Sequence, residues 1–242
     1  MKPLFLFWLL IFSTQSHGYV AREERVLLVV SELDSTGAPE MRDLYRITEE
    51  LTLSAVNIFL KPYYGEVQYL LGHEATIPNF KKALLEMSHR EDIMAIDVIL
   101  SLHGSEKKLT FFDKKWKLPS LEHEFIKLNS TSLRKKLRMM YNLSCYGSYH
   151  NASFIKMGFD ASVGSVAVNA NSEIEFIPFL NAWREGHGFQ KSFDLTNNDF
   201  ALNLSDAPIK VYGEWKKSSL SKTNSKKIFV GNTELRIASD AK

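Results

Sequence analysis

Apolar residues fall into two patterns along the chain: short continuous runs, and longer stretches in which they recur every three or four positions. The short runs are rich in aliphatic side chains and predict buried strands at residues 25–33, 66–71, 93–103 and 137–144. Between them, residues 39–60 and 77–88 have the spacing of amphipathic helices. Strands that alternate with helices predict an α/β fold, doubly wound, with a mostly parallel sheet and helices on both faces.

The rest of the chain continues this alternation with two changes of pattern. Residues 108–112 and 116–118 flank a polar turn, which predicts a hairpin. Further elements are predicted as a small strand at 165–169 and helices at 119–128, 151–157, 174–185 and 189–200. Beyond residue 201 the pattern predicts edge strands at 209–212 and 228–237, the second broken by Gly231-Asn232 as a tight turn. A basic, serine-rich stretch typical of a solvated loop separates them at 216–227. We therefore expect an α/β domain over 19–200 and a C-terminal edge-strand extension over 201–242.

The N-terminus has the pattern of a secretory signal peptide over residues 1–18. Lys2 precedes an apolar run, and small polar residues then favour cleavage before Tyr19. A membrane anchor is the alternative, but the apolar run is shorter than the about 20 residues that span a bilayer. We expect an exported protein, secreted or periplasmic, with no stable membrane insertion after cleavage. The net charge of +2 argues against nucleic acid as an obligate partner.

The chain has a single cysteine, Cys145, so no internal disulfide can form. In an exported protein a leftover thiol is reactive, paired with another chain, or buried and inert. Cys145 follows one predicted strand, and His103 ends another just before Gly104. If these strands are parallel neighbours, Cys145 and His103 emerge side by side at the carboxyl edge of the sheet, where ligands bind in this architecture.

The two residue types together suit acyl transfer. A thiol with a pKa of about 8.5 is mostly protonated at neutral pH, and a nearby imidazole can take its proton. Cys145 is then the nucleophile and His103 the general base, and the separation, 145 − 103 = 42 residues, leaves room for a hairpin, a helix and the return strand. The main-chain N–H groups of Gly104 and Cys145 are candidate donors to the oxyanion.

A hydrophobic strand that ends in His-Gly, followed by one that ends in Cys, resembles the caspase-like cysteine peptidases, a group that includes caspases, legumain, gingipain, clostripain and separase. Their caspase signature is Q-A-C-[RQG]-G, with the histidine about 50 residues upstream. Cys145 and Gly147 match it, whereas Leu143, Ser144 and Tyr146 depart from it. Residues 165–193 also resemble the segment after the catalytic cysteine, and the whole resemblance covers about 25–199.

The resemblance implies a three-layer α/β/α catalytic domain over 19–200 that hydrolyses peptide or protein substrates without a cofactor. Cys145 attacks the scissile carbonyl, and His103 protonates the leaving amine. P1 specificity in this group comes from the ends of the first strand and of the strand after the cysteine, where the sequence has Asp34, Ser35, Asn169 and Asn171. Asp34 or Asp160 can form a pocket for a basic P1 side chain, although short acidic residues more often form turns or caps.

Several alternatives stay open at this point. The non-family Leu143 and Ser144 favour a catalytically inactive caspase-like fold that serves as a binding or interaction module, with a buried Cys145 and a structural His103. Another hydrolase or transferase that uses the same thiol is a weaker alternative. His150 is a rival base, but its expected place is near a helix start. No Gly-rich phosphate loop and no His-Glu-x-x-His metal motif occurs, and the glycosylation sequon at Asn142 falls inside a predicted strand.

Overall fold

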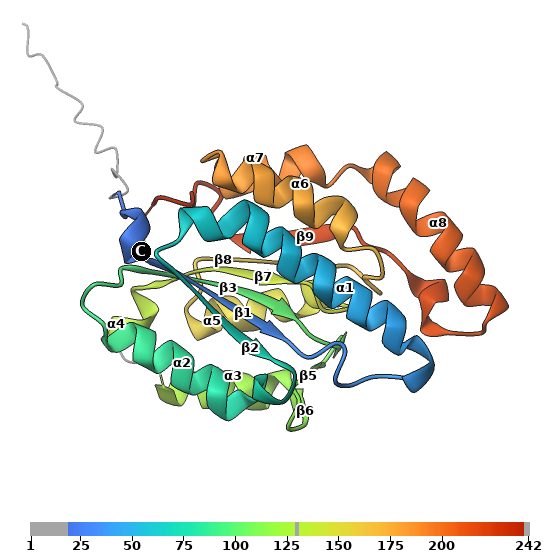
Figure 1. Cartoon of the computed structure of the whole chain (residues 1–242), viewed down its shortest axis with the longest axis horizontal. Coiled ribbons are helices and arrows are strands. Elements are labelled where there is room, and N and C mark those ends of the chain that lie inside the picture. Colours follow the sequence, from blue (N-terminus) through green and yellow to red (C-terminus); the bar gives the residue numbers. More distant parts are fainter. Residues whose placement is uncertain (1–18, 129–130, 240–242) are drawn as a thin grey trace, which may run out of the picture.

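The computed structural model describes residues 19–128 and 131–239, so the predicted signal peptide lies outside the described residues. A six-stranded sheet in the order β2-β1-β3-β7-β8-β9 forms the centre of the molecule (Figure 1). Five strands are parallel, and β9 runs antiparallel to β8. The strands are β1 Arg25–Ser31, β2 Glu66–Leu71, β3 Ala95–Ser101, β7 Leu137–Asn142, β8 Ala161–Ser165 and β9 Lys227–Gly231.

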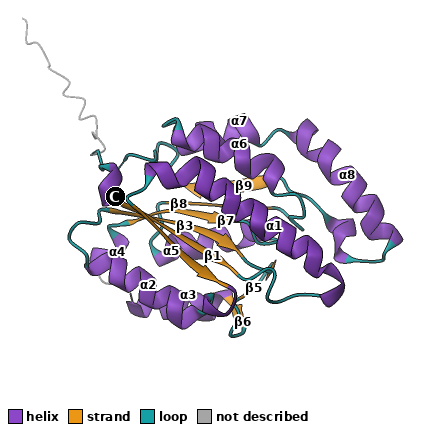
Figure 2. Cartoon of the chain, viewed as in Figure 1, coloured by secondary structure: helices purple, strands orange, loops and turns teal. Residues whose placement is uncertain are grey.

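Helices cover both faces of this sheet, as the secondary-structure colouring shows (Figure 2). One face carries α1 Arg42–Ala55, α6 Glu173–Arg184 and α7 Phe189–Thr196. The other carries α2 Ile77–His89, α3 Leu118–Leu128 and α5 Asn151–Met157. Smaller elements are α4 Thr131–Arg134 and the hairpin region of β4 Gly104–Ser105, β5 Lys108–Thr110 and β6 Lys115–Lys117. The prediction of a doubly wound, three-layer α/β/α fold is confirmed.

The apolar runs form strands because the central strands are buried on both faces. Every residue of β1, β3 and β7 is buried. In β1, Val26, Leu28 and Val30 pack against α2 and α3, whereas Leu27 and Val29 pack against α1 and α6. Side chains of a strand point alternately to opposite faces, so one apolar run serves both cores. Within the described part of the chain, no helix is long and apolar enough to cross a membrane.

The strand predicted at residues 165–169 is displaced toward the N-terminus. The observed strand is β8, Ala161–Ser165, whose sequence ASVGS has small side chains and little apolar signal. Gly164 explains part of this composition, because a Cβ there would clash with the main chain of Gly147. Close approach of two backbones selects for glycine and hides the strand from a hydrophobicity pattern.

The strand predicted at residues 209–212 is wrong. These residues lie inside α8, Asp199–Trp215, which begins where the Asn198 side chain accepts hydrogen bonds from the N–H groups of Phe200 and Ala201. A short apolar run does not distinguish a strand from a helix. The Asn198 cap favours a helix that begins at Asp199 and continues through these residues. The strand predicted from residue 228 is β9, which ends at the predicted break, where Gly231 has a φ of 116°; the described residues after the break form no further strand of the sheet.

A buried ion pair joins the sheet to the C-terminal segment. Arg138 on β7 and Asp97 on β3 are both fully buried, and their side chains form a salt bridge. Tyr64 donates to the same carboxylate at 2.7 Å, and Arg138 also donates to the carbonyl of Ile237 at 2.9 Å. Each charge therefore has partners that replace the water it loses on folding.

We expect Asp97→Ala to lower the free energy of unfolding by about 3–5 kcal/mol, because it leaves the Arg138 guanidinium buried without its counter-charge. Urea denaturation followed by circular dichroism measures this loss. Asp92→Ala is the control, since Asp92 pairs with Arg90 at the surface and its loss should change stability far less. Equal losses of unfolding free energy in the two variants would contradict the role of Asp97 as the buried counter-charge of Arg138.

Candidate active site

The register of β3, β7 and β8 brings the two predicted reactive residues to one edge of the sheet. Leu100 of β3 is opposite Asn142 of β7, and Asn142 is opposite Gly164 of β8. The N–H of Leu143 then donates to the carbonyl of Leu100 at 2.8 Å, so the two chains continue side by side beyond the strands. His103 and Cys145 follow directly, and both line one pocket.

His103 is held by contacts at its main chain and at its ring. Its N–H donates to the Glu32 carboxylate at 2.8 Å, and its Nε2 lies 3.0 Å from the carbonyl oxygen of Thr36. A carbonyl only accepts, so Nε2 carries the proton, and Nδ1 of the neutral ring keeps a lone pair. The Tyr45 ring packs edge-on against the imidazole, with centroids 4.5 Å apart. The free lone pair is what a general base needs.

The loop after β1 is shaped around this histidine. Gly37 has a φ of 103°, and a Cβ there would lie 2.5 Å from His103 Nε2. Glu32 is fully buried and also accepts from the Thr36 hydroxyl, so one carboxylate fixes both the loop and the His103 main chain. Burial raises the pKa of Glu32, and the hydrogen bonds from Thr36 and His103 oppose that rise. Sequence reasoning missed Glu32, because it reads as the polar end of an apolar strand.

Cys145 sits at a sharp turn beyond β7. The next residue, Tyr146, has a φ of 59°, a left-handed conformation that non-glycine residues rarely adopt. Two hydrogen bonds hold the turn, from the N–H of Tyr146 to Ala167 at 2.7 Å and from the N–H of Gly147 to Ser144 at 3.1 Å. A Cβ on Gly104 would lie 2.5 Å from the Cys145 carbonyl oxygen, so the residue after His103 lies directly against the main chain of Cys145.

The Cys145 thiol is half-buried and has one defined hydrogen bond. The main-chain N–H of Asn169 lies 3.4 Å from Sγ and donates to it. Burial raises the pKa of this thiol, while the Asn169 N–H and the positive charge of Lys227 partly offset the rise. The resting side chain is therefore a thiol rather than a thiolate at neutral pH, and it needs a base to react.

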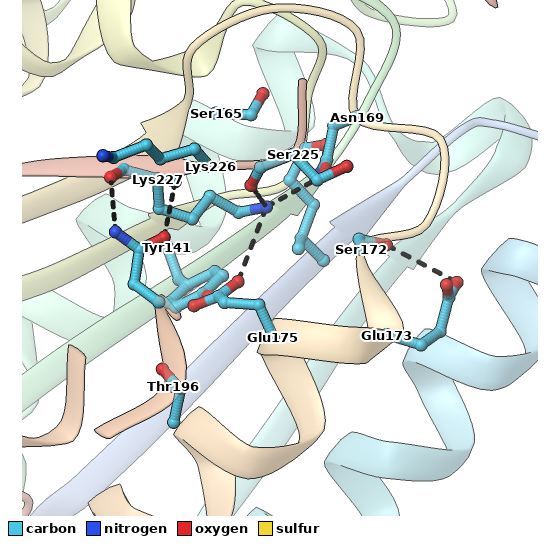
Figure 3. Close-up of polar contacts among 12 residues, drawn as sticks. Tyr141, Ser165, Asn169, Ser172, Glu173, Glu175, Thr196, Ser225, Lys226 and Lys227 are labelled. Atoms are coloured by element: carbon cyan, nitrogen blue, oxygen red, sulfur yellow. Dashed lines mark hydrogen bonds and ion pairs between the residues drawn. The ribbon is translucent and has the colours of Figure 1, made fainter. Parts of the chain in front are cut away.

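A buried lysine, Lys227, contacts Asn169, the residue whose N–H donates to Cys145 (Figure 3). The Nζ atom of Lys227, the first residue of β9, lies 2.9 Å from Asn169 Oδ1 and 3.5 Å from Glu175 Oε2. The Asn169 amide in turn donates to the Leu143 carbonyl at 2.8 Å. Tyr141 donates to Glu175 at 2.6 Å from the far side. Burial lowers the pKa of Lys227 and raises the pKa of Glu175, and the contact between them counters both changes.

Lys227 corrects the prediction that residues 216–227 form a solvated basic loop. Its side chain is fully buried, whereas the neighbouring Lys226 points outward and pairs with Asp199 at 2.9 Å. The alternation of a strand explains the difference, since adjacent side chains point to opposite faces. A charge surrounded by serine and lysine residues gives no hydrophobicity signal for burial, so sequence reasoning missed Lys227.

The predicted specificity residues separate into two groups. Asn169 lines the pocket beside Cys145. Asp34, Ser35 and Asn171 do not line it. Asp34 and Ser35 form the turn after β1, and Asn171 is held by Ser205 and Ser225. The Asn171 amide instead contacts α8 and the segment before β9, so a role in substrate binding stays a prediction for this residue.

Two other residues considered from the sequence have structural roles. Asp160 precedes β8 and so lies at the amino edge of the sheet, away from Cys145. His150 is buried, with Nδ1 2.9 Å from the Asn142 amide and Nε2 2.7 Å from the Ser105 carbonyl. Both ring nitrogens are occupied, which removes His150 as a rival base. Asn142 is itself buried by these contacts and has no room for a glycan.

The pocket that holds Cys145 and His103 has a volume of about 200 Å³. Its apolar walls include Leu33, Leu44, Leu143, Val168 and Leu220, which come from five segments of the chain. Leu220 lies in the turn Ser219–Lys222, which connects α8 to β9. Among the described residues, no group of three or more His, Cys, Asp or Glu side chains is placed to hold a metal ion.

No protein-family model and no curated protein matches the sequence. Among solved structures, caspase-1 from Spodoptera frugiperda is similar over 89% of this chain and 89% of its own, with a TM-score of 0.52 and 11% sequence identity. The chain has a caspase-like fold. The resemblance inferred from the strand ends around His103 and Cys145 is therefore confirmed at the level of the fold.

Within this caspase-like fold, we expect Cys145 to react slowly with iodoacetamide at neutral pH. Because burial raises the pKa of the thiol, the alkylation rate should still be rising well above pH 8.5, where a free cysteine is about half ionised. Mass spectrometry of the intact protein over a pH series measures the rate. A rate that is already constant at pH 8 would contradict the raised pKa.

The double variant Lys227→Met/Glu175→Gln removes both buried charges together and leaves neither unpaired. Because the Lys227 charge lowers the pKa of Cys145, its loss should move the alkylation profile to still higher pH. Lys226→Met is the matched control, since that side chain faces solvent, and its profile should stay that of the unsubstituted protein. A double variant with an unchanged profile would show that Lys227 does not act on the thiol.

Proposed function

We propose that this protein is an exported cysteine endopeptidase in which Cys145 is the nucleophile and His103 the general base and acid. One observation carries the proposal: Cys145 and His103 line the same pocket, and Nε2 of His103 is already committed to the Thr36 carbonyl. Nδ1 is then the nitrogen available for proton transfer. The caspase-like fold supports this chemistry, and the signal-like residues 1–18 support export to the periplasm or the exterior.

Acylation follows from the positions of these groups. Cys145 Sγ attacks the carbonyl carbon of a bound peptide as its proton passes to His103 Nδ1. The carbonyl π bond opens, and the negative charge moves to oxygen. His103 then gives the proton to the amide nitrogen, the C–N bond breaks, and the amine leaves. Because the resting group is a thiol, proton transfer and attack are coupled.

The oxyanion needs donors beside Sγ, and Gly104 and Cys145 are suited to supply them. Thr110 donates to the His103 carbonyl at 2.8 Å, which places Gly104 opposite Leu109 at a non-hydrogen-bonded position of the hairpin. The Gly104 N–H is therefore directed away from β5. The Cys145 main chain lies against Gly104. Two such N–H groups can share the negative charge of a tetrahedral intermediate.

Deacylation uses the same base. His103 takes a proton from a water molecule as the water oxygen attacks the thioester carbonyl. The C–S bond then breaks, the carboxylic acid leaves, and the proton returns to the thiolate. The Glu32 carboxylate accepts from the His103 main-chain N–H and so keeps the residue in place through both steps.

We expect Cys145→Ala to abolish hydrolysis of a fluorogenic peptide library and His103→Ala to lower it by about 10²- to 10⁴-fold. His89→Ala is the control, since His89 is exposed at the end of α2 and distant from the pocket. Activity that survives in Cys145→Ala would overturn the assignment of the nucleophile.

Peptide binding without hydrolysis is the second candidate, and the raised pKa of the Cys145 thiol favours it. A binding module should bind peptides equally well with and without the Cys145 side chain and release no product. Isothermal titration and product analysis on the unsubstituted protein and on Cys145→Ala distinguish it from a peptidase.

A further inference from the structure

We propose that the pocket beside Cys145 receives an uncharged substrate side chain of about the size of leucine or methionine, and that the enzyme cleaves after such residues rather than after charged ones. This inference rests on the proposed function. It goes further by naming the substrate class, which the sequence left open.

The pocket is on the acyl side of the scissile bond. It contains both Cys145 and His103, whereas a second hollow shares His103 but not Cys145. Because the acyl group becomes attached to Cys145 and the leaving amine takes its proton from His103, the hollow without the cysteine belongs to the leaving group. The pocket with Cys145 therefore receives the side chain that precedes the cleaved bond.

Its size and walls suit one aliphatic side chain. The volume of about 200 Å³ is below the roughly 300–1,000 Å³ of pockets that enclose whole small ligands. Leu33, Leu44, Leu143, Val168 and Leu220 line it from five segments of the chain. A side chain that fills this space exchanges water for apolar contact, and one methylene group in such a pocket changes the rate by roughly 10- to 200-fold.

No fixed charge is available for a charged side chain. None of the described residues that line the pocket is Asp, Glu, Lys or Arg. Lys227, the cation whose charge acts on Cys145, is already held by Glu175 and Asn169, and the Asn169 amide is held by Leu143 and Lys227. The remaining polar groups are hydroxyls such as those of Thr48 and Ser101, together with the His103 ring. A carboxylate or ammonium group would lose its hydration there without gaining a counter-charge.

Peptidyl chloromethyl ketones that differ only in the residue next to the ketone test the pocket without requiring catalysis. Leucine and aspartate form one pair of similar size, and methionine and lysine form another. We expect the leucine and methionine reagents to modify Cys145 at least tenfold faster than their charged partners, as measured by intact mass against Cys145→Ser. Equal or faster modification by the aspartate or lysine reagent would overturn the inference, as would four equal rates.

A designed charge provides a second test. Thr48→Glu places a carboxylate in the pocket, whereas Ile47→Glu places the same charge one residue away on the exposed face of α1. Thr48→Glu should slow the leucine reagent and accelerate the lysine reagent, and Ile47→Glu should leave both rates unchanged. An unchanged preference in a folded Thr48→Glu variant would show that the side chain binds elsewhere.

Hydrolysis assays on the unsubstituted protein separate this inference from the proposed function. Selective labelling by the leucine reagent without hydrolysis of any peptide would retain the pocket assignment and overturn the peptidase. Rapid hydrolysis after aspartate or lysine would retain the peptidase and overturn the pocket assignment.

Discussion

Parallel pairing between β3 and β7 is the constraint on which the site depends. Main-chain hydrogen bonds fix Leu100 opposite Asn142, and the bond from Leu143 to Leu100 extends this register beyond the strands. A shift of one residue would turn every side chain to the other face of the sheet. The buried alternation of β3 and β7 makes such a shift costly, so His103 and Cys145 reach the same edge in a fixed relation. The chemistry of the site thus follows from the packing of two apolar strands.

Buried charged residues hold in place the loops and the C-terminal segment that lie outside the sheet. Asp97 and Arg138 fix the C-terminal segment to the amino half of the sheet, and Glu32 fixes the loop that contacts the His103 ring. Lys227 fixes the turn of Asn169, whose N–H faces Cys145. Such charges are expensive to bury and stabilise a fold only when their partners are complete. Their role here is to fix positions: Glu32 and Lys227 hold main-chain segments next to His103 and Cys145, and the Asp97–Arg138 pair holds the C-terminal segment at the opposite half of the sheet.

The sequence predicted the parts of this structure that depend on local pattern. The continuous apolar runs identified β1, β3 and β7, and strand ends pointed to His103 and Cys145. The sequence-based predictions failed where contacts between residues distant in sequence determine the local structure. β8 was displaced because the contact of Gly164 with Gly147 requires small residues, and α8 was missed where Ile209 to Tyr212 gave an ambiguous short run. Glu32 and Lys227 were missed because a charged residue signals exposure unless its partners, distant in sequence, are known.

The apolar pocket and the reactivity of Cys145 have a common physical origin. Walls such as Leu143 and Val168 exclude water from the space beside Sγ, which favours an uncharged substrate side chain and at the same time disfavours the thiolate. The same exclusion strengthens the hydrogen bonds that a substrate carbonyl makes once it is bound. In the proposed mechanism, such a site keeps Cys145 protonated until a substrate arrives, and the lone pair of His103 Nδ1 removes the proton during attack. On this proposal, low reactivity toward general alkylating agents and selectivity for aliphatic side chains are two results of one desolvated pocket.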